Sequence, residues 1–294
     1  MRVLVASGGG AHGSFQIGVC EKLAETGVQY DGFAGISVGN LLAAHCAGYE
    51  DFAEAIAVYK DVWVEHVKDD SDIIKPWWPS WLKFLSYLPA PFKGSLYSTA
   101  PFRSLVQKVF FPARVRDSGK KLAVSAVSMT SGKLRTWNEK SVSHDAIVAS
   151  ASFPLAFQPV VLDGEEYLDG GLRDVTPISQ AIAMGATELD IIMCQPEGME
   201  PIKKSKWKIL KMFDLAKRVI GILMDELIEN DIQGVVKTNK RIESGAVSDR
   251  RMIKVRVFRP QDKLHSTSLN FKQEDWLINY HTGLEVADSL LKDQ

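Results

Sequence analysis

Residues 1–47 read MRVLVASGGGAHGSFQIGVCEKLAETGVQYDGFAGISVGNLLAAHCA, and this stretch decides the fold class. The short apolar run 3–6 predicts a strand, the glycines after it predict a tight loop, and apolar residues at helical spacing predict a helix over 14–23. The same succession follows at once, with a predicted strand over 30–36 and a predicted helix over 38–47. Strands that alternate with helices are typical of a mostly parallel central sheet covered by helices on both sides. The predicted fold class is therefore α/β.

Hydrophobic periodicity predicts further elements along the 294 residues. Helices are expected over 52–67, 146–152 and 178–184, and strands over 121–129, 134–137, 160–162, 167–168, 189–194 and 252–258. A terminal helix is predicted from about Gln273, and a long amphipathic helix is marked by Trp207, Leu210, Phe213, Ile220, Leu223 and Leu227. We expect a single domain over 1–294, with the chemical motifs in 1–194 and added helices and a strand in 195–294.

The composition is that of an ordinary globular protein and argues against some function classes. Hydrophobic residues make up 46% and charged residues 24% of the chain, and the formal net charge is -1. A pI near 6.6 without a basic stripe is not the charge pattern of a nucleic-acid-binding protein. Cys20, Cys46 and Cys194 form neither a close pair nor a CxxC spacing, so we expect reduced thiols and no zinc site or disulfide framework.

Targeting segments are not evident in the sequence. The apolar run after Met1 is too short for the hydrophobic region of a signal peptide. No run approaches the roughly 18 apolar residues that a membrane span requires. We therefore expect a cytoplasmic protein whose contact with membranes is peripheral.

The strongest single motif is Gly35-Ile36-Ser37-Val38-Gly39, a GxSxG between a predicted strand and a predicted helix. A serine on a sharp strand-to-helix turn needs glycine on both sides, because side chains there would collide with the turn or with the neighbouring strand. The N-terminus of the following helix also favours developing negative charge. Ser37 is therefore the candidate nucleophile, although a GxSxG also arises by chance in glycine-rich turns.

The second motif is the loop Gly8-Gly9-Gly10-Ala11-His12-Gly13, which permits two interpretations. It matches the GxGxxG of dinucleotide-binding proteins, in which an acidic residue at the end of the second strand holds a ribose hydroxyl. Asp31 has about the right spacing, but it precedes the second strand. The same loop beside Ser37 is suited to an oxyanion hole made of the backbone amides of Gly8, Gly9 and Gly10.

A serine nucleophile needs a base, and the sequence offers a carboxylate rather than a histidine. His12 lies in the glycine loop, and the other five histidines lie in contexts that favour structural or surface roles. In Leu168-Asp169-Gly170-Gly171 an apolar strand ends at an acid whose two following residues have no side chains. Asp169 is therefore the candidate base, and the alternative is an ordinary Asp-Gly turn at a strand end.

Together, the three motifs in this order resemble the patatin-like phospholipase family. The segment Ala149-Ser150-Ala151-Ser152-Phe153-Pro154 is similar to the family's approach to its Asp-Gly-Gly, and the resemblance covers roughly residues 1–194. It implies hydrolysis of lipid acyl esters, of phospholipase A or lysophospholipase type, by a Ser37–Asp169 dyad without a metal or an organic cofactor. The implied partner is a lipid or another acyl-ester substrate.

Two positions depart from the family pattern. Family glycine loops often carry Arg or Lys where this chain has His12, and Asn is common after the Asp-Gly-Gly where this chain has Val175. His12 in place of Arg or Lys affects how the glycine loop is held or how it binds anionic headgroups. Two rival functions remain at this point: a nucleotide-dependent oxidoreductase that uses the GxGxxG loop, and a catalytically silent lipid-binding protein.

A Trp-rich segment over 75–92 interrupts the α/β pattern, with four prolines among Trp77, Trp78 and Trp81. Trp side chains favour the headgroup region of a membrane, so the segment is a candidate lid or interfacial anchor. A packed helical excursion explains the same composition equally well. Five lysines between Lys203 and Lys211 could likewise face anionic lipid, although a solvated helix face is the simpler interpretation.

Overall fold

The computed structural model describes residues 1–77, 95–198, 212–246 and 251–292. Within these residues eight strands form one sheet in the order β10-β9-β1-β2-β5-β8-β7, with β6 pairing to β5 off this path. The pairs from β10 to β5 are parallel, and the pairs β5–β6, β5–β8 and β7–β8 are antiparallel. The bounds are β1 Arg2–Ala6, β2 Gly32–Gly35, β5 Lys121–Ser128, β6 Leu134–Asn138, β7 Val160–Leu162, β8 Glu165–Asp169, β9 Glu188–Ile192 and β10 Lys254–Phe258.

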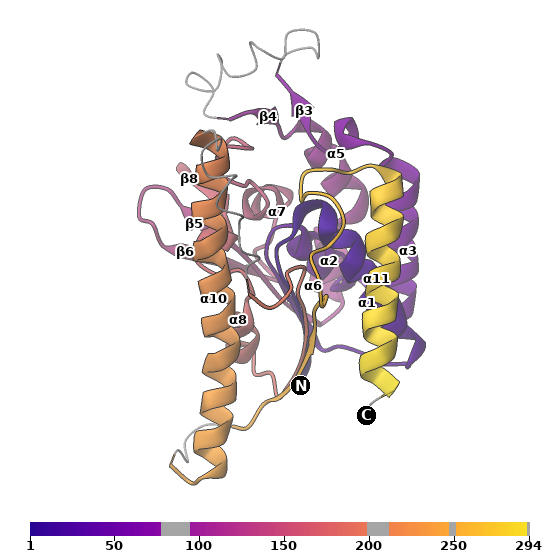
Figure 1. Cartoon of the computed structure of the whole chain (residues 1–294), viewed down its shortest axis with the longest axis vertical. Helices are drawn as coiled ribbons and strands as arrows, with labels where there is room; N and C mark the ends of the chain where they lie inside the picture. Colours follow the sequence, from indigo (N-terminus) through magenta and orange to yellow (C-terminus); the bar gives the residue numbers. More distant parts are fainter. Residues whose placement is uncertain (78–94, 199–211, 247–250, 293–294) are drawn as a thin grey trace, which may run out of the picture.

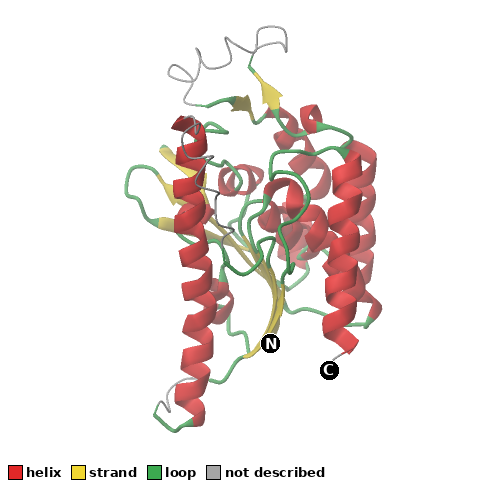
Figure 2. Cartoon of the chain, in the orientation of Figure 1, coloured by secondary structure: helices red, strands yellow, loops and turns green. Residues whose placement is uncertain are grey.

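Helices cover both faces of the sheet, which confirms the predicted α/β class (Figure 1). One face carries α8 Ile178–Ala183 and α10 Met212–Glu243, the long helix that stands apart in Figure 2. The other face carries α1 Gly13–Glu25, α2 Val38–Cys46, α3 Phe52–His66, α5 Ala100–Val109, α6 Pro112–Asp117, α7 His144–Ser150 and α11 Gln273–Lys292.

Strand β1 explains why the sheet has two separate cores. Val3 and Val5 join the apolar cluster under α8 and α10, whereas Leu4 and Ala6 join the larger cluster on the opposite face. Alternate side chains of a strand point to opposite faces, and a central parallel strand is buried on both of them. A continuous apolar run therefore encodes this strand.

The C-terminal segment is built into the same structure. Strand β10 extends the sheet by pairing with β9, and α11 packs against α1. The two helices meet at Gly18 and Gly283, where a Cβ on either glycine would collide with a backbone carbonyl of the other helix. The close crossing thus depends on two residues that lie far apart in the sequence.

Helices α5 and α6 form where the sequence analysis predicts none. Each has a proline in its first turn, Pro101 in α5 and Pro112 in α6. Proline suits the start of a helix because the N–H that it lacks would have no partner there. The prolines of this segment therefore fit the starts of two helices.

Two predictions fall partly outside the described residues. Of the Trp-rich segment, residues 78–92 lie outside them, and Lys75–Pro76 (β3) pairs with Tyr97–Ser98 (β4) at its base. The predicted long helix is confirmed over 212–243, whereas Trp207, Leu210 and the lysines over 203–211 lie outside. Among the described helices, none combines the length and apolarity that a membrane crossing needs.

Candidate active site

The peptide backbone of Ser37 is strained, at the turn between β2 and α2. Its φ is 56° and its ψ is -127°, a conformation that an L-residue rarely adopts outside functional sites. The flanking glycines are sterically required, because a Cβ on Gly35 would overlap the backbone at Gly39. A Cβ on Gly39 would lie 2.5 Å from the carbonyl oxygen of Ser7. The GxSxG sequence therefore folds into a nucleophile elbow.

Sheet register brings Asp169 to the level of Ser37. Gly35 pairs with Val124, so Ser37 follows two residues beyond that pair. Strand β5 continues past the end of β2, and its Ala126, also two residues beyond Val124, pairs with Asp169 of β8. Asp169 comes from an antiparallel strand and still ends beside the carboxyl end of β2.

Burial sets the electrostatics of Asp169, which is 2% exposed. Removal from water raises the pKa of its carboxyl to about 7, while the N–H of Gly171 and the hydroxyl of Ser37 lower it. The Gly171 N–H donates to Oδ1 at 2.8 Å. Oδ2 has no hydrogen-bond partner that meets strict geometric limits among the described residues, although the Ser37 hydroxyl lies close enough to lower the pKa of the carboxyl.

Gly170 and Gly171, which follow Asp169, lie where there is little room for a side chain. A Cβ on Gly170 would lie 2.5 Å from the carbonyl oxygen of Ser125 and 2.8 Å from Ile36 Cδ1. A Cβ on Gly171 would lie 3.1 Å from Asp169 Oδ1. These residues let the chain turn away from the elbow while the carboxylate stays next to it.

The glycine loop lies against Ser37, since a Cβ on Gly8 would lie 3.4 Å from the Cβ of Ser37. The N–H of Gly8 donates to the carbonyl oxygen of Val175 at 3.3 Å. No described residue accepts a hydrogen bond from the N–H of Gly9 or Gly10. Of the three predicted oxyanion donors, the structure thus leaves Gly9 and Gly10 available, while Gly8 is engaged through a long bond.

One cavity of about 1030 Å³ joins these groups, because Ser37, Asp169 and the glycine loop all line it. Its size and its largely apolar wall are typical of a small-molecule site. Aromatic residues line it at Trp63, Tyr97, Phe102, Phe153, Phe157 and Phe271. Besides Asp169, charged residues line it at Asp70, Arg218, Asp225, Lys263 and Lys272.

Several residues around this cavity were not predicted as part of the site. The hydroxyl of Ser150 accepts a hydrogen bond from the N–H of Ser37 at 3.3 Å. The carbonyl oxygen of Ser268, in the loop before α11, accepts from the N–H of Ala11 at 2.8 Å. Ser150 lies in the segment that resembles the family, which was a usable signal, whereas nothing local in the sequence marks Ser268.

The six histidines have surroundings of their own, and one of them, His12, lies in the glycine loop. Among the described residues His12 is the one histidine that lines the cavity, and burial lowers its pKa. His45 is buried between the carbonyl oxygens of Val109 and Ala55, and burial lowers its pKa to about 4. His265 contacts Asp275 at 2.9 Å. No described histidine bonds to Asp169, so a triad is not assembled.

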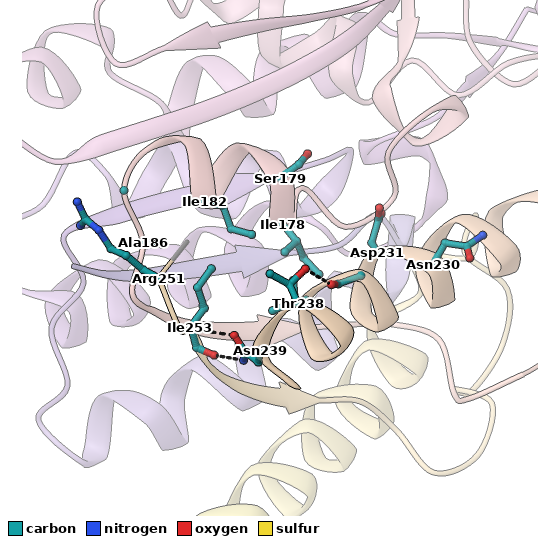
Figure 3. A pocket seen from close by; sticks show the side chains of 13 residues that line it. Ile178, Ser179, Ile182, Ala186, Asn230, Asp231, Thr238, Asn239, Arg251 and Ile253 are labelled. Carbon is teal, nitrogen blue, oxygen red and sulfur yellow. Dashed lines mark hydrogen bonds between the residues drawn. The ribbon is translucent and has the colours of Figure 1, made fainter. Parts of the chain in front are cut away.

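A second cavity of about 640 Å³ lies between α8, α10 and residues 251–253, and it shares no lining residue with the first (Figure 3). Asn239 on its wall exchanges two hydrogen bonds with the backbone of Ile253. Within the described ranges, no three His, Cys, Asp or Glu side chains gather in a way that could hold a metal ion.

Comparison with known proteins places these motifs in a family. Residues 4–182 match the patatin-like phospholipase family. Over 185 residues the chain is 26% identical to patatin-like phospholipase domain-containing protein 7 of Rattus norvegicus, covering 62% of this chain and 13% of that protein. It is also 27% identical over 185 residues to lysophospholipase NTE1 of Yarrowia lipolytica, covering 63% of this chain and 12% of that protein.

The chain therefore spans only about an eighth of the length of these curated relatives. Among solved structures, VipD from Legionella pneumophila aligns with a TM-score of 0.48 at 14% identity, over 99% of this chain and 67% of that one. The family match covers more than half of the chain and contains the glycine loop, the elbow and the Asp-Gly-Gly. The chain belongs to the patatin-like phospholipase family.

Proposed function

We propose that this protein is a serine acylhydrolase that cleaves lipid acyl esters, with Ser37 as the nucleophile and Asp169 as its base. The observation that carries the proposal is the strained Ser37 backbone at the level of a buried carboxylate, inside one cavity. Strain of this kind persists where the surrounding structure enforces it, commonly at active sites.

The reaction follows from these positions. Ser37 Oγ attacks the ester carbonyl carbon while its proton passes to Asp169, and the carbonyl oxygen becomes an oxyanion near the amides of Gly9 and Gly10. The C–O bond to the alcohol then breaks, and Asp169 returns the proton to the leaving oxygen. Water repeats the sequence on the acyl-enzyme, which releases the fatty acid and restores Ser37.

The shifted acid makes direct base catalysis reasonable. An unperturbed aspartate is a weak base, whereas a carboxylate with a pKa near 7 is matched to neutral pH. No histidine is required between acid and serine in this scheme, which agrees with the positions of the histidines.

The cavity supports a lipid rather than a nucleotide substrate. Aromatic side chains along its wall suit an acyl chain, and the named relatives are a phospholipase-domain protein and a lysophospholipase. We therefore propose activity of phospholipase A or lysophospholipase type, at a lipid surface that the protein contacts peripherally. A cytoplasmic location, suggested by three free and buried cysteines, is part of this proposal.

The rival functions receive less support. Asp31 would have to hold a ribose near the glycine loop, but its carboxylate accepts from the N–H of Arg2, at the opposite end of β1. A silent lipid-binding protein would not need both Ser37 and Asp169 in one cavity with a strained elbow.

The test is hydrolysis of pure phospholipids, lysophospholipids, monoacylglycerols and short p-nitrophenyl esters, with labelling by a fluorophosphonate. Ser37→Ala should abolish both, and Ser104→Ala, a matched change at an exposed position of α5, should abolish neither. More than a tenth of wild-type activity in Ser37→Ala would exclude the serine mechanism. Faster hydrolysis of vesicles than of monomeric lipid would support peripheral contact, and equal rates would count against it.

A further inference from the structure

Gln195 reaches the glycine loop from the far end of the matched region. It follows β9, lines the catalytic cavity, and its Nε2 donates to the carbonyl oxygen of Gly8 at 3.1 Å. The amide orientation is determined by chemistry, because a carbonyl oxygen can only accept and so must face the NH₂ group. Gln195 lies beyond residue 182, where the family match ends.

The bond to Gly8 acts on the N–H of Gly9. That carbonyl and that N–H belong to one planar peptide, and no described peptide is cis. In a trans peptide the C=O and N–H point in opposite directions, so a donor that holds the Gly8 oxygen turns the Gly9 N–H away from Gln195. This N–H is one of the two loop amides without an acceptor among the described residues.

The neighbouring peptides of the loop are held by other groups. The Gly8 N–H donates to Val175, and the Gly9 carbonyl accepts from the N–H of His12 at 3.2 Å. Gln195 therefore supplies the side-chain amide that fixes the orientation of the Gly8–Gly9 peptide. The hydroxyl of Ser7 donates to the same oxygen at 3.2 Å, which is long for a bond between two oxygens.

Gln195 is itself held in place from β10. Arg259, directly after this strand, donates from Nη2 to the carbonyl oxygen of Pro196 at 2.9 Å and from Nε to that of Gln195 at 3.4 Å. The Oε1 of Gln195 is buried without a partner among the described residues, which costs stability.

We propose that Gln195 is a positioning residue for the oxyanion hole, which orients the Gly9 N–H through the Gly8 carbonyl. The inference rests on the proposed function, since it assigns a role within that site. Its effect belongs to the transition state, because the oxyanion forms only there, so the loss should fall on kcat and not on KM.

Gln195→Met keeps the length of the side chain and removes the donor, and Gln195→Glu puts acceptor oxygens and a negative charge beside the Gly8 carbonyl. Loss of a whole oxyanion donor typically costs about 100-fold to 1000-fold in kcat. A misoriented donor should cost less, so we expect about 10-fold to 100-fold for Met and more for Glu, with KM within about twofold. Phosphonylation of Ser37 by a fluorophosphonate should slow by a similar factor, because the phosphonyl oxygen occupies the same position.

The readout is kcat, taken as the maximal rate divided by the concentration of titrated active sites, so a partly unfolded variant does not imitate a catalytic defect. Gln233→Met, the same substitution on α10 outside the catalytic cavity, is the matched control and should behave as wild type. If Gln195→Met folds poorly, Arg259→Met tests the same connection from one step further away, with an expected loss of about threefold to tenfold in kcat at unchanged KM.

The proposed function and the role of Gln195 are separated by different results. Wild-type hydrolysis and Ser37 labelling with unchanged kcat in all three variants would overturn the role of Gln195 and leave the proposed function standing. A raised KM at constant kcat would overturn it as well, since it would indicate substrate binding. Absence of hydrolysis and of labelling in the wild type would remove the proposed function, and the role of Gln195 with it.

Discussion

Replacing Asp169 by Asn should inactivate the protein and stabilise its fold. The amide keeps an oxygen for the N–H of Gly171, now 2.8 Å from Oδ1, but it cannot take a proton from Ser37. We expect kcat to fall about a thousandfold or more, which is on the order of 4 kcal/mol in the barrier. The gain in stability comes from the same burial that makes Asp169 a better base.

The size of that gain follows from the pKa, which rises from 3.8 to about 7 on folding. Because the native pKa is raised, the unfolded chain loses its proton first, and native stability falls as the pH increases through this interval. At about 1.4 kcal/mol per pKa unit, this pKa difference lowers the native stability by about 1.5 kcal/mol at pH 5, where the native carboxyl stays protonated, and by about 4 kcal/mol at pH 8, where it is ionised. Asn carries no such cost at either pH.

The assay is thermal or urea unfolding of wild type, Asp169→Asn and Ser37→Ala at pH 5 and pH 8. The stability advantage of the Asn variant should grow by about 2.5 kcal/mol between these pH values, or about 4 °C in Tm. Ser37→Ala keeps the carboxylate, so its stability should fall with rising pH as in the wild type. The fall should be at least as large, because the variant loses the Ser37 hydroxyl that lowers the pKa of Asp169. Asp174 and Asp231, whose burial also raises their pKa, are present in all three proteins and cancel.

Two results would refute this reasoning. An Asn variant that kept a tenth of wild-type kcat on a soluble ester would exclude Asp169 as the base. A stability difference that stayed constant from pH 5 to pH 8 would mean that the carboxyl is not buried as described. In the wild type, kcat/KM should increase with pH through about 7 as Asp169 ionises, and a flat profile would contradict the same assignment.

Three further substitutions test the framework of the site. Gly39→Ala should abolish activity and destabilise the fold, because its Cβ would overlap carbonyl oxygens at the end of β1, and near-normal kcat and Tm would contradict the elbow geometry. Gly283→Val should lower Tm by separating α11 from α1 at the Phe15 carbonyl, which unfolding curves would detect, while an unchanged Tm would deny the close crossing. Arg256→Met should lower the free energy of unfolding by about 3–5 kcal/mol, because it leaves the buried Asp190 carboxylate without its bidentate partner. A loss of less than about 1 kcal/mol in urea unfolding would contradict this pairing.

Much of the candidate site is predictable because the backbone needs it locally. The glycines on either side of Ser37 are required by contacts within a single turn, so they appear in the sequence as a short fixed pattern. The same is true of Gly170 and Gly171 after the acid. The strands and helices that present these turns were also predicted, since each depends on the spacing of apolar side chains over a few residues.

Other parts of the site have no such local cause. Helices α5 and α6 were not predicted, and their first-turn prolines fit a helix start without requiring one. Ser150 contacts the backbone of Ser37 across 113 positions of sequence, and Gln195 contacts Gly8 across 187. Hydrogen bonds between such distant segments leave no periodic pattern from which they could be read.

The sequence by itself determined the α/β class, the order of the three motifs, and the identity of the candidate nucleophile and base. Only the tertiary structure decided that Asp169 lies level with Ser37, that burial raises its pKa to about 7, and that Gly8 already donates to Val175. The physical reason is the range of the interactions involved. Turn geometry and apolar spacing act between residues near in sequence, whereas register, desolvation and hydrogen bonding across the sheet exist only after distant segments have packed together.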